Sequence, residues 1–373
     1  MKKMLLSFLA SFCLFVPMAF AQWDGNPITV DNPVSTSPQS ESGIFSVTDG
    51  SGGAIVMWIG NDQSGNYVNA QHKSSTGQVL WGTNVATPKQ LFSSANEIEI
   101  NDLVNDGAGG AYVSWSESIT DSTTDVFIQH VNNSGTALFT AGGLRLNPVN
   151  GQDNNTARLI SDAAGVIVAW DVQSPDSTFT LTSTAQIIVQ RFNAQGVAQW
   201  TAGGVQLCTA AGQRAFPCIL SDGGNGAFIG FVDARNSGVD VNNEPNNIDI
   251  YAQHLSSSGA RLWGTGGVIV TNQLYNQVLT GFSNNKSIIS DRNGGFIVAY
   301  NDYRNNNNDL LKAPLYAQRI NSSGARVWAA PGVAISTSAT FSVFFTGMVS
   351  DGVNGAVIGW NEASFQTKTG NEY

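Results

Sequence analysis

The residues of this chain best suited to chemistry are acidic side chains that follow short apolar runs. Each lies one or two residues beyond an aromatic that ends such a run: Glu117, Asp171, Asp233, Asp302 and Glu362. Two of them precede an arginine by two residues, which gives the pairs Asp233/Arg235 and Asp302/Arg304. Carboxylates gathered at one place could bind sugar hydroxyls, ligate Ca²⁺ or act as a general acid and base. The alternative is strand-end salt bridges and loop caps, which contribute little to stability when they are exposed.

The three histidines offer less chemistry than the acidic residues. His72, His130 and His254 each follow a glutamine, and Arg191 and Arg319 take the same place elsewhere in the chain. Residues at the same place in successive copies of a repeat lie far from one another in space. We therefore expect neither a histidine metal centre nor a Ser–His catalytic pair.

A fixed spacing divides the chain into repeats that must position these residues. Five times a glutamine is followed ten residues later by an aromatic: Gln71/Trp81, Gln129/Phe139, Gln190/Trp200, Gln253/Trp263 and Gln318/Trp328. A polar turn and a short apolar strand recur six times and end on an aromatic: Trp58, Trp115, Trp170, Phe231, Tyr300 and Trp360. Turns and strands of this kind indicate about four strands in each unit. The sequence therefore predicts an all-β chain folded as a β-propeller of six four-stranded blades.

The recurrence of these aromatics and glutamines favours a structural role for both. We expect the tryptophans to pack between blades, and the glutamines to make buried hydrogen bonds that fix the register of the strands. The apolar strand is apolar on both faces, as in residues 54–58, which a sheet covered on both sides requires.

The two ends of the chain match each other. Residues 23–30 resemble residues 263–270, the last strand of a unit, and Tyr373 aligns with Tyr251 and Tyr316, which lie two residues before a repeat glutamine. The N-terminal strand can therefore close the ring against an incomplete last blade. We expect the propeller domain, residues 22–373, to be truncated at its C-terminus, so that a longer parent chain could hold more blades.

The first 21 residues are typical of a secretory signal peptide. Lys2 and Lys3 precede an apolar run over residues 4–16, and residues 19–21, Ala-Phe-Ala, form a small-x-small cleavage site. No later stretch approaches the ~20 apolar residues of a membrane helix. We expect a protein that is secreted or held at the cell surface, with no membrane insertion of the mature chain.

The composition narrows the choice of partners. Charged residues make up 12% of the chain, against roughly 25% in an average soluble protein. The net charge of -10 argues against a nucleic-acid partner, because proteins bind the negatively charged phosphates of nucleic acids through Lys and Arg. Cys208 and Cys218 remain beyond the leader, and they would form either a disulfide, as exported proteins allow, or two buried thiols.

One segment of the unit carries a family resemblance. Residues 317–328, Ala-Gln-Arg-Ile-Asn-Ser-Ser-Gly-Ala-Arg-Val-Trp, resemble the repeat of quinoprotein-type (PQQ-like) propellers, which runs Ala-x-Asp-x-x-x-Gly with a Trp a few residues on. Gln318 stands near the place of the usual aspartate. Overall the chain is similar to secreted bacterial repeat propellers. The resemblance implies the fold, but no cofactor or catalytic residue carries over, since the required positions are not matched.

These observations lead to a prediction of function. Loops of variable sequence should share one face of the propeller, where binding residues usually lie: residues 120–125, 173–184, 236–247 and 305–312. Their Asn and Asp side chains could ligate Ca²⁺, and no other cofactor is expected. We expect a non-catalytic recognition or scaffold module that binds a glycan or an extracellular protein. One alternative is a polysaccharide hydrolase or lyase that uses two of the carboxylates, and another is a structural surface or adhesin segment.

Overall fold

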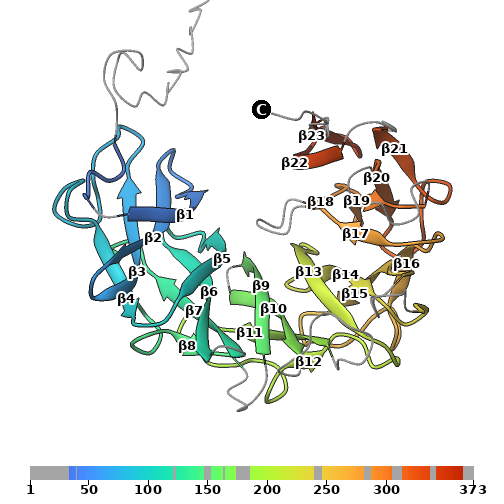
Figure 1. Cartoon of the computed structure of the whole chain (residues 1–373), viewed down its shortest axis with the longest axis horizontal. Helices are drawn as coiled ribbons and strands as arrows, with labels where there is room; N and C mark the ends of the chain where they lie inside the picture. The colour runs from blue at the N-terminus through green and yellow to red at the C-terminus, as the bar shows by residue number, and fades with distance from the viewer. Residues whose placement is uncertain are drawn as a thin grey trace, which may run out of the picture.

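The chain folds into sheets of antiparallel strands set around a common centre (Figure 1). The computed structural model describes residues 33–38, 40–120, 123–146, 153–162, 164–173, 185–238, 246–280, 287–304, 313–336 and 342–363. Within these residues the chain forms 23 strands and no helix. Accordingly, no helix in the described ranges is long and apolar enough to cross a membrane.

Six sheets follow one another along the chain. The first holds β1 (Ser40–Thr48), β2 (Ala54–Asp62), β3 (Gly65–Lys73) and β4 (Lys89–Ser94). The second holds β5 (Ile98–Asn105), β6 (Ala111–Thr120), β7 (Thr123–Val131) and β8 (Leu144–Arg145). The third holds β9 (Asp153–Asp162), β10 (Gly165–Gln173), β11 (Gln186–Phe192) and β12 (Val205–Gln206).

The fourth sheet holds β13 (Arg214–Ser221), β14 (Ala227–Asp233), β15 (Asp249–Leu255) and β16 (Val268–Thr271). In the fifth, β17 (Gln277–Leu279) and β18 (Ile288–Ser290) both pair with β19 (Phe296–Asp302), followed by β20 (Leu315–Ile320) and β21 (Val333–Ser336). The sixth holds β22 (Ser342–Ser350) and β23 (Ala356–Ala363). In each sheet the first strand lies nearest the centre and the last strand lies at the perimeter (Figure 1). This arrangement confirms the predicted all-β propeller, and its six sheets agree with the predicted six blades, the last of which has two strands within the described residues.

The core of the protein lies between successive sheets, as expected from strands that are apolar on both faces. Ile55 and Met57 of the first sheet pack with Val113 and Trp115 of the second, and all four are buried. The same stacking of second strands recurs in the clusters between the later sheets. Burying apolar side chains on both faces of each sheet is the main term that holds neighbouring blades together.

The repeat glutamines fix the strand register through hydrogen bonds, which confirms that prediction. Gln129 is buried, and its Oε1 accepts the N–H groups of His130 at 3.0 Å and Phe139 at 2.8 Å. Its Nε2 donates to the oxygen of Thr140 at 3.1 Å. The glutamine side chain therefore ties the third strand to the turn that leads toward the fourth, and the pattern recurs at Gln190, Gln253 and Gln318.

The histidine positions are also structural. Nε2 of His72 and of His130 lies 3.0 Å from a carboxylate oxygen of Asp49 and of Asp106, at the turn between the first and second strands. In the third and fifth sheets an arginine takes the place of the histidine and pairs with the same aspartate: Arg191 with Asp162, and Arg319 with Asp291. The shared geometry explains why His and Arg alternate at one place of the repeat.

Cys208 and Cys218 are buried free thiols in this structure, so the disulfide predicted as one option is not formed. Cys208 belongs to the core between the third and fourth sheets, whereas Cys218 belongs to the core between the fourth and fifth. The fourth sheet lies between the two sulfur atoms, which explains why no bridge forms.

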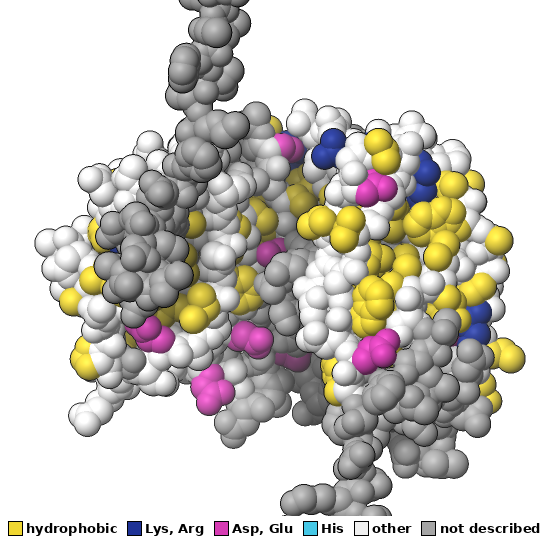
Figure 2. Space-filling view, turned by 90° about the horizontal axis from the view of Figure 1, so that it is seen from above, with side chains coloured by type: hydrophobic (Ala, Val, Ile, Leu, Met, Phe, Trp, Pro, Cys, Tyr) yellow, Lys and Arg dark blue, Asp and Glu magenta, His cyan; other side chains and the backbone are white. Residues whose placement is uncertain are grey.

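The sixth sheet keeps one apolar face in contact with solvent. Val357 on β23 is 60% exposed, whereas Ile297, at the same place in the fifth sheet, is fully buried. Figure 2 shows exposed hydrophobic side chains over the part of the molecule where Figure 1 places the fifth and sixth sheets. The segment predicted to close the ring, residues 23–30, and the chain beyond residue 363 lie outside the described residues.

Candidate functional site

The inner strands of the first four sheets each carry a bulge at about the same height. Pairing with the second strand skips between Ser42 and Phe45 on β1, and between Ile100 and Asp102 on β5. On β13 it skips between Ala215 and Cys218, and the β9–β10 pairing shifts in the same way beside Asp171. A bulge turns the extra residue out of the regular alternation, and bulges are over-represented next to active sites.

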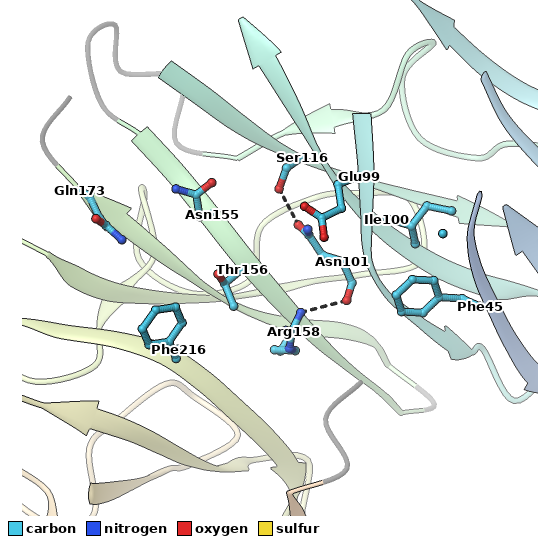
Figure 3. A pocket seen from close by; sticks show the side chains of 11 residues that line it. Phe45, Glu99, Ile100, Asn101, Ser116, Asn155, Thr156, Arg158, Gln173 and Phe216 are labelled. Atoms are coloured by element: carbon cyan, nitrogen blue, oxygen red, sulfur yellow. Dashed lines mark hydrogen bonds between the residues drawn. The ribbon is translucent and has the colours of Figure 1, made fainter. Parts of the chain in front are cut away.

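A cavity of about 510 Å³ opens at these bulges (Figure 3). This volume falls within the ~300–1,000 Å³ of typical small-molecule sites. We call it the axial pocket and define it by its lining residues: Gly43, Phe45, Glu99, Ile100, Asn101, Ser116, Asn155, Thr156, Arg158, Gln173 and Phe216. Most of them come from the bulged segments of β1, β5, β9 and β13. The lining combines two aromatic rings with amide, hydroxyl, carboxylate and guanidinium groups.

Asp171 lies directly behind the wall of this pocket. The carboxyl is fully buried, its Oδ2 accepts the N–H of Phe216 at 3.0 Å, and the hydroxyl of Thr156 is a second hydrogen-bond partner. Among the described residues, Oδ1 has no hydrogen-bond partner. Burial raises the pKa of Asp171 to about 8, against the weaker lowering effects of the Phe216 N–H, the Arg158 charge and Thr156. Asp171 therefore holds a proton at neutral pH, as a general acid must.

Arg158 lies within electrostatic reach of Asp171 and of two further carboxyl groups. Its guanidinium is buried, and Nη1 donates to the backbone oxygens of Asn101 at 2.9 Å and Ala157 at 3.1 Å. Burial lowers the pKa of Arg158, while the nearby carboxyl groups of Asp102, Asp171 and Glu99 oppose that effect. Glu99 is exposed and lines the pocket on the side of β5 (Figure 3). One arginine thus lies within electrostatic reach of a buried carboxyl and an exposed one.

Two residues of the pocket have backbone conformations that L-amino acids rarely adopt. Thr156 has a φ of 53° and Phe216 a φ of 55°, and both are hydrogen-bond partners of Asp171. A β-branched or bulky residue with positive φ is a true outlier. Such strain of order 1–3 kcal/mol persists only where the surroundings enforce it, and it is concentrated at functional sites.

The other sequence-predicted carboxylates lie away from the axial pocket and are already paired. Asp233 is fully buried and binds Arg214 at 2.9 Å and Arg235 at 2.6 Å, and Asp302 pairs with Arg304. Glu117 accepts hydrogen bonds from Ser94 and from Asn96, and Glu362 accepts them from Ser336 and Trp360. The structure thus separates Asp171 from the other four candidates, and a binding role for those four and their arginines stays a prediction.

A one-residue difference explains this separation. Asp171 directly follows the aromatic that ends the apolar run, whereas the other four follow it by two residues. Because side chains alternate between the two faces of a strand, that shift places Asp171 on the opposite face. The residues at this place in the first, second and fourth sheets are Ile59, Ser116 and Val232. Among the first four units, therefore, only the third has a carboxyl group here.

Glu99, Arg158 and Phe216 were not among the sequence candidates. Their one signal is that β5 and β9 carry polar residues, Glu99, Asn101 and Asn155, in strands that face the centre of the molecule. No group of three His, Cys, Asp or Glu within the described residues could hold a metal ion. The loop stretches in which Ca²⁺ ligation was predicted fall mainly outside the described residues, so that prediction stays open.

No protein-family model matches the chain, and no curated protein sequence matches it either. The resemblance to quinoprotein-type repeats therefore stays a prediction. Solved structures similar in fold include a levansucrase of Bacillus subtilis, with 9% identity and a TM-score of 0.40 over 79% of this chain and 85% of that chain. An endo-arabinase of Bacteroides thetaiotaomicron shares 12% identity and a TM-score of 0.36 over 80% and 98%.

A third structure is a subtype N10 neuraminidase-like protein of A/little yellow-shouldered bat. It shares 10% identity and a TM-score of 0.43 over 83% of this chain and 86% of that chain. At these identities and scores the likeness concerns only the general arrangement of the sheets.

The predicted non-catalytic recognition or scaffold module is wrong as the main interpretation. That prediction depended on the absence of a catalytic constellation, whereas Arg158 in the axial pocket lies within electrostatic reach of both Asp171 and Glu99. The similar structures include proteins named as enzymes, a levansucrase, a family-43 glycoside hydrolase and an endo-arabinase. The side chains of the axial pocket favour the hydrolase alternative over a module without chemistry.

Proposed function

We propose that this protein is a glycoside hydrolase whose reaction takes place in the axial pocket. The observation that carries the proposal is Asp171, a fully buried carboxyl behind the pocket wall with a pKa raised to about 8. A carboxyl that keeps its proton at neutral pH, with a second carboxyl in another environment at the same pocket, is the arrangement that glycoside hydrolysis uses.

In this mechanism the two carboxyl groups take different roles. Asp171 is the source of the proton that reaches the glycosidic oxygen. The hydroxyl of Thr156, which lines the pocket and is hydrogen-bonded to Asp171, takes this proton and gives its own to the glycosidic oxygen as the bond between that oxygen and the anomeric carbon breaks. Glu99 either takes a proton from the water that attacks the anomeric carbon or attacks that carbon itself, and the anomer of the product distinguishes the two routes. Arg158, which lies within electrostatic reach of both carboxyl groups, stabilises negative charge as it moves from one to the other.

The remaining lining suits a ligand rich in hydroxyl groups. Asn101 and Ser116 are hydrogen-bonded to each other at 2.8 Å, which holds an amide and a hydroxyl at the pocket wall. Asn155 donates to Asp153 at 2.8 Å, and this contact orients its amide. In small-molecule sites, a few polar groups held in fixed orientations beside apolar and aromatic side chains determine how the ligand is oriented.

Export of the protein is part of this proposal. The predicted leader, residues 1–21, lies outside the described residues.

The test is hydrolysis of a panel of neutral and acidic oligosaccharides by the full chain, followed by chromatography of the products. We expect Asp171→Asn and Glu99→Gln each to lower kcat by ~10²–10⁴, because each removes one proton-transfer or nucleophilic group. Glu362→Gln is the matched control, a sequence-predicted carboxyl on the sixth sheet, and it should keep full activity. Absence of hydrolysis across the panel, or full activity in Asp171→Asn, would contradict the proposal.

A further inference from the structure

Phe216 differs from the other residues that form the axial bulges. The bulge of β13 leaves Phe216 and Pro217 outside the pairing with β14, and Phe216 has a φ of 55°. A bulky side chain disfavours this region, and a following proline favours an extended conformation instead. At the corresponding bulges of the first three sheets, the residues that leave the pairing include Gly43, Asn101 and Thr156, none of which is aromatic.

The unfavourable backbone is held by a hydrogen bond from another sheet. The N–H of Phe216 donates to Oδ2 of Asp171 at 3.0 Å, and Asp171 belongs to β10 of the third sheet. Because Asp171 is fully buried, this bond is shielded from water and fixes the backbone at Phe216. The same carboxyl that is proposed as the general acid therefore also sets the position of the aromatic ring.

The ring lies where a ligand of the pocket would meet it. Phe216 is partly buried against the core between the fourth and fifth sheets, and it also lines the axial pocket. Figure 3 shows Phe216 and Phe45 on opposite sides of the pocket, with Thr156 and Arg158 between them. An aromatic face carries negative partial charge and attracts polarised C–H groups, such as those on the apolar face of a pyranose ring.

We propose that Phe216 is the platform on which a sugar ring of the substrate stacks, and that Asp171 holds it there against its backbone preference. The inference deepens the proposed glycoside hydrolysis and rests on it. It restricts the substrate to glycans that present a sugar with an unsubstituted apolar face at the reaction centre. If Phe216 were kept in its strained conformation for packing alone, its ring would not have to line the pocket as well as contact the core.

Two pairs of variants test whether the backbone at Phe216 is strained. Phe216→Ala and Phe216→Gly remove the same ring, but only Gly accepts a positive φ freely. We therefore expect Phe216→Gly to unfold at a higher urea concentration than Phe216→Ala. Phe45→Ala and Phe45→Gly form the matched control, because Phe45 lies in a strand with an ordinary φ, and there the order should be reversed. If the Ala variant is the more stable of the pair at both positions, Phe216 carries no strain. That result would overturn the positioning role of Asp171.

A second comparison tests whether the ring stacks on a sugar. Phe216→Leu keeps an apolar side chain of similar size but loses the aromatic face, whereas Phe216→Tyr keeps that face. Binding is measured by calorimetric titration of each oligosaccharide of the panel into these variants in the Glu99→Gln background. We expect Kd to rise about tenfold or more in Phe216→Leu and to stay within about threefold in Phe216→Tyr. An unchanged Kd in Phe216→Leu would overturn the stacking role.

The outcomes for the two proposals can be told apart. Hydrolysis by the wild-type chain with an unchanged Kd in Phe216→Leu contradicts only the platform. Oligosaccharide binding that depends on the Phe216 ring, with no hydrolysis by the wild-type chain, contradicts only the proposed reaction. Absence of both binding and hydrolysis across the panel contradicts both.

Discussion

The indole N–H of Trp81 donates to the backbone oxygen of Asn133, 2.8 Å away in the next sheet. The Trp81 ring also covers Gly135 in the same turn, where an added Cβ would lie 3.1 Å from Cγ of the ring. Trp200 repeats the contact with the oxygen of Ser257 at 2.9 Å and with Gly259. Each of these aromatics therefore joins the perimeter of one blade to the next, in addition to filling the core.

This contact predicts a difference between two glycines of the second sheet. Gly135 has a φ of 76° and is covered by Trp81, whereas Gly142 has a φ of 80° and open space around it. We expect Gly142→Ala to lower the free energy of unfolding by ~1–2 kcal/mol, because Ala is strained at positive φ. Gly135→Ala should cost more, since the methyl group also displaces the Trp81 ring. Urea denaturation of both variants measures the difference, and equal costs would show that the contact between blades is loose.

The pairing of Asp106 with His130 predicts a loss of stability in acid. Burial acts to raise the pKa of Asp106, but hydrogen bonds from His130 and from the N–H groups of Ala108 and Gly110 outweigh it and lower the pKa. A carboxylate with a lowered pKa stabilises the fold above its unfolded value of ~3.9 and loses that contribution as pH falls further.

The check on Asp106 is the free energy of unfolding of wild type and Asp106→Asn at pH 6 and pH 3. We expect the wild type to be the more stable at pH 6 and the difference to shrink at pH 3, below the unfolded pKa, where the unfolded chain takes up a proton at this carboxylate more readily than the folded protein does. A difference that stays the same at both pH values would mean that ionisation of Asp106 does not support the fold.

Asp171 predicts the opposite dependence on pH. Burial raises its pKa to about 8, so the folded protein holds this proton more tightly than the unfolded chain, whose value is ~3.9. The penalty for ionising the buried carboxyl therefore grows as pH rises from about 4 to about 8. We expect Asp171→Asn to match the wild type in stability near pH 4 and to exceed it near pH 8, by an amount on the order of 1–5 kcal/mol.

Two measurements check the role of Asp171. Chemical denaturation of wild type and Asp171→Asn at both pH values tests the stability difference, and a constant difference would place the pKa of Asp171 near its ordinary value. The dependence of kcat/KM on pH should show an alkaline limb near pH 8, where a general acid with this pKa loses its proton. Activity that stays level well above pH 8 would assign the acid role to another group.

The fold could be predicted from the sequence because its determinants recur. Gln129 and Phe139 keep the same separation as Gln190 and Trp200, and in each pair the glutamine oxygen accepts the N–H of the aromatic residue. Repetition averages out local ambiguity, so six weak signals together define one architecture. The same repetition showed that the histidines were structural, as their aspartate partners confirm.

The candidate site could not be predicted in the same way because it depends on where the repeats differ. The bulges of β5, β9 and β13 turn residues such as Arg158 and Phe216 toward the pocket, and no sequence period signals a shift of register. Asp171 was chosen as one of five carboxylates, and the one-residue offset that gives it a different environment becomes meaningful only with the strand pairing. Glu99 faces the same pocket from a separate sheet, and sequence alone does not bring the two together.

The exposed face of the sixth sheet predicts a further difference between equivalent residues. Val357 and Ile297 hold the same place in successive units, but Val357 is 60% exposed and Ile297 is fully buried. Ile297→Ala should lower the free energy of unfolding by ~2–5 kcal/mol, because it leaves a cavity between the fifth and sixth sheets. Val357→Ala should change it by less than ~0.5 kcal/mol, as expected of a surface substitution. If urea denaturation gives similar costs for both variants, the outer face of the sixth sheet is covered in solution by another segment or a second copy of the chain.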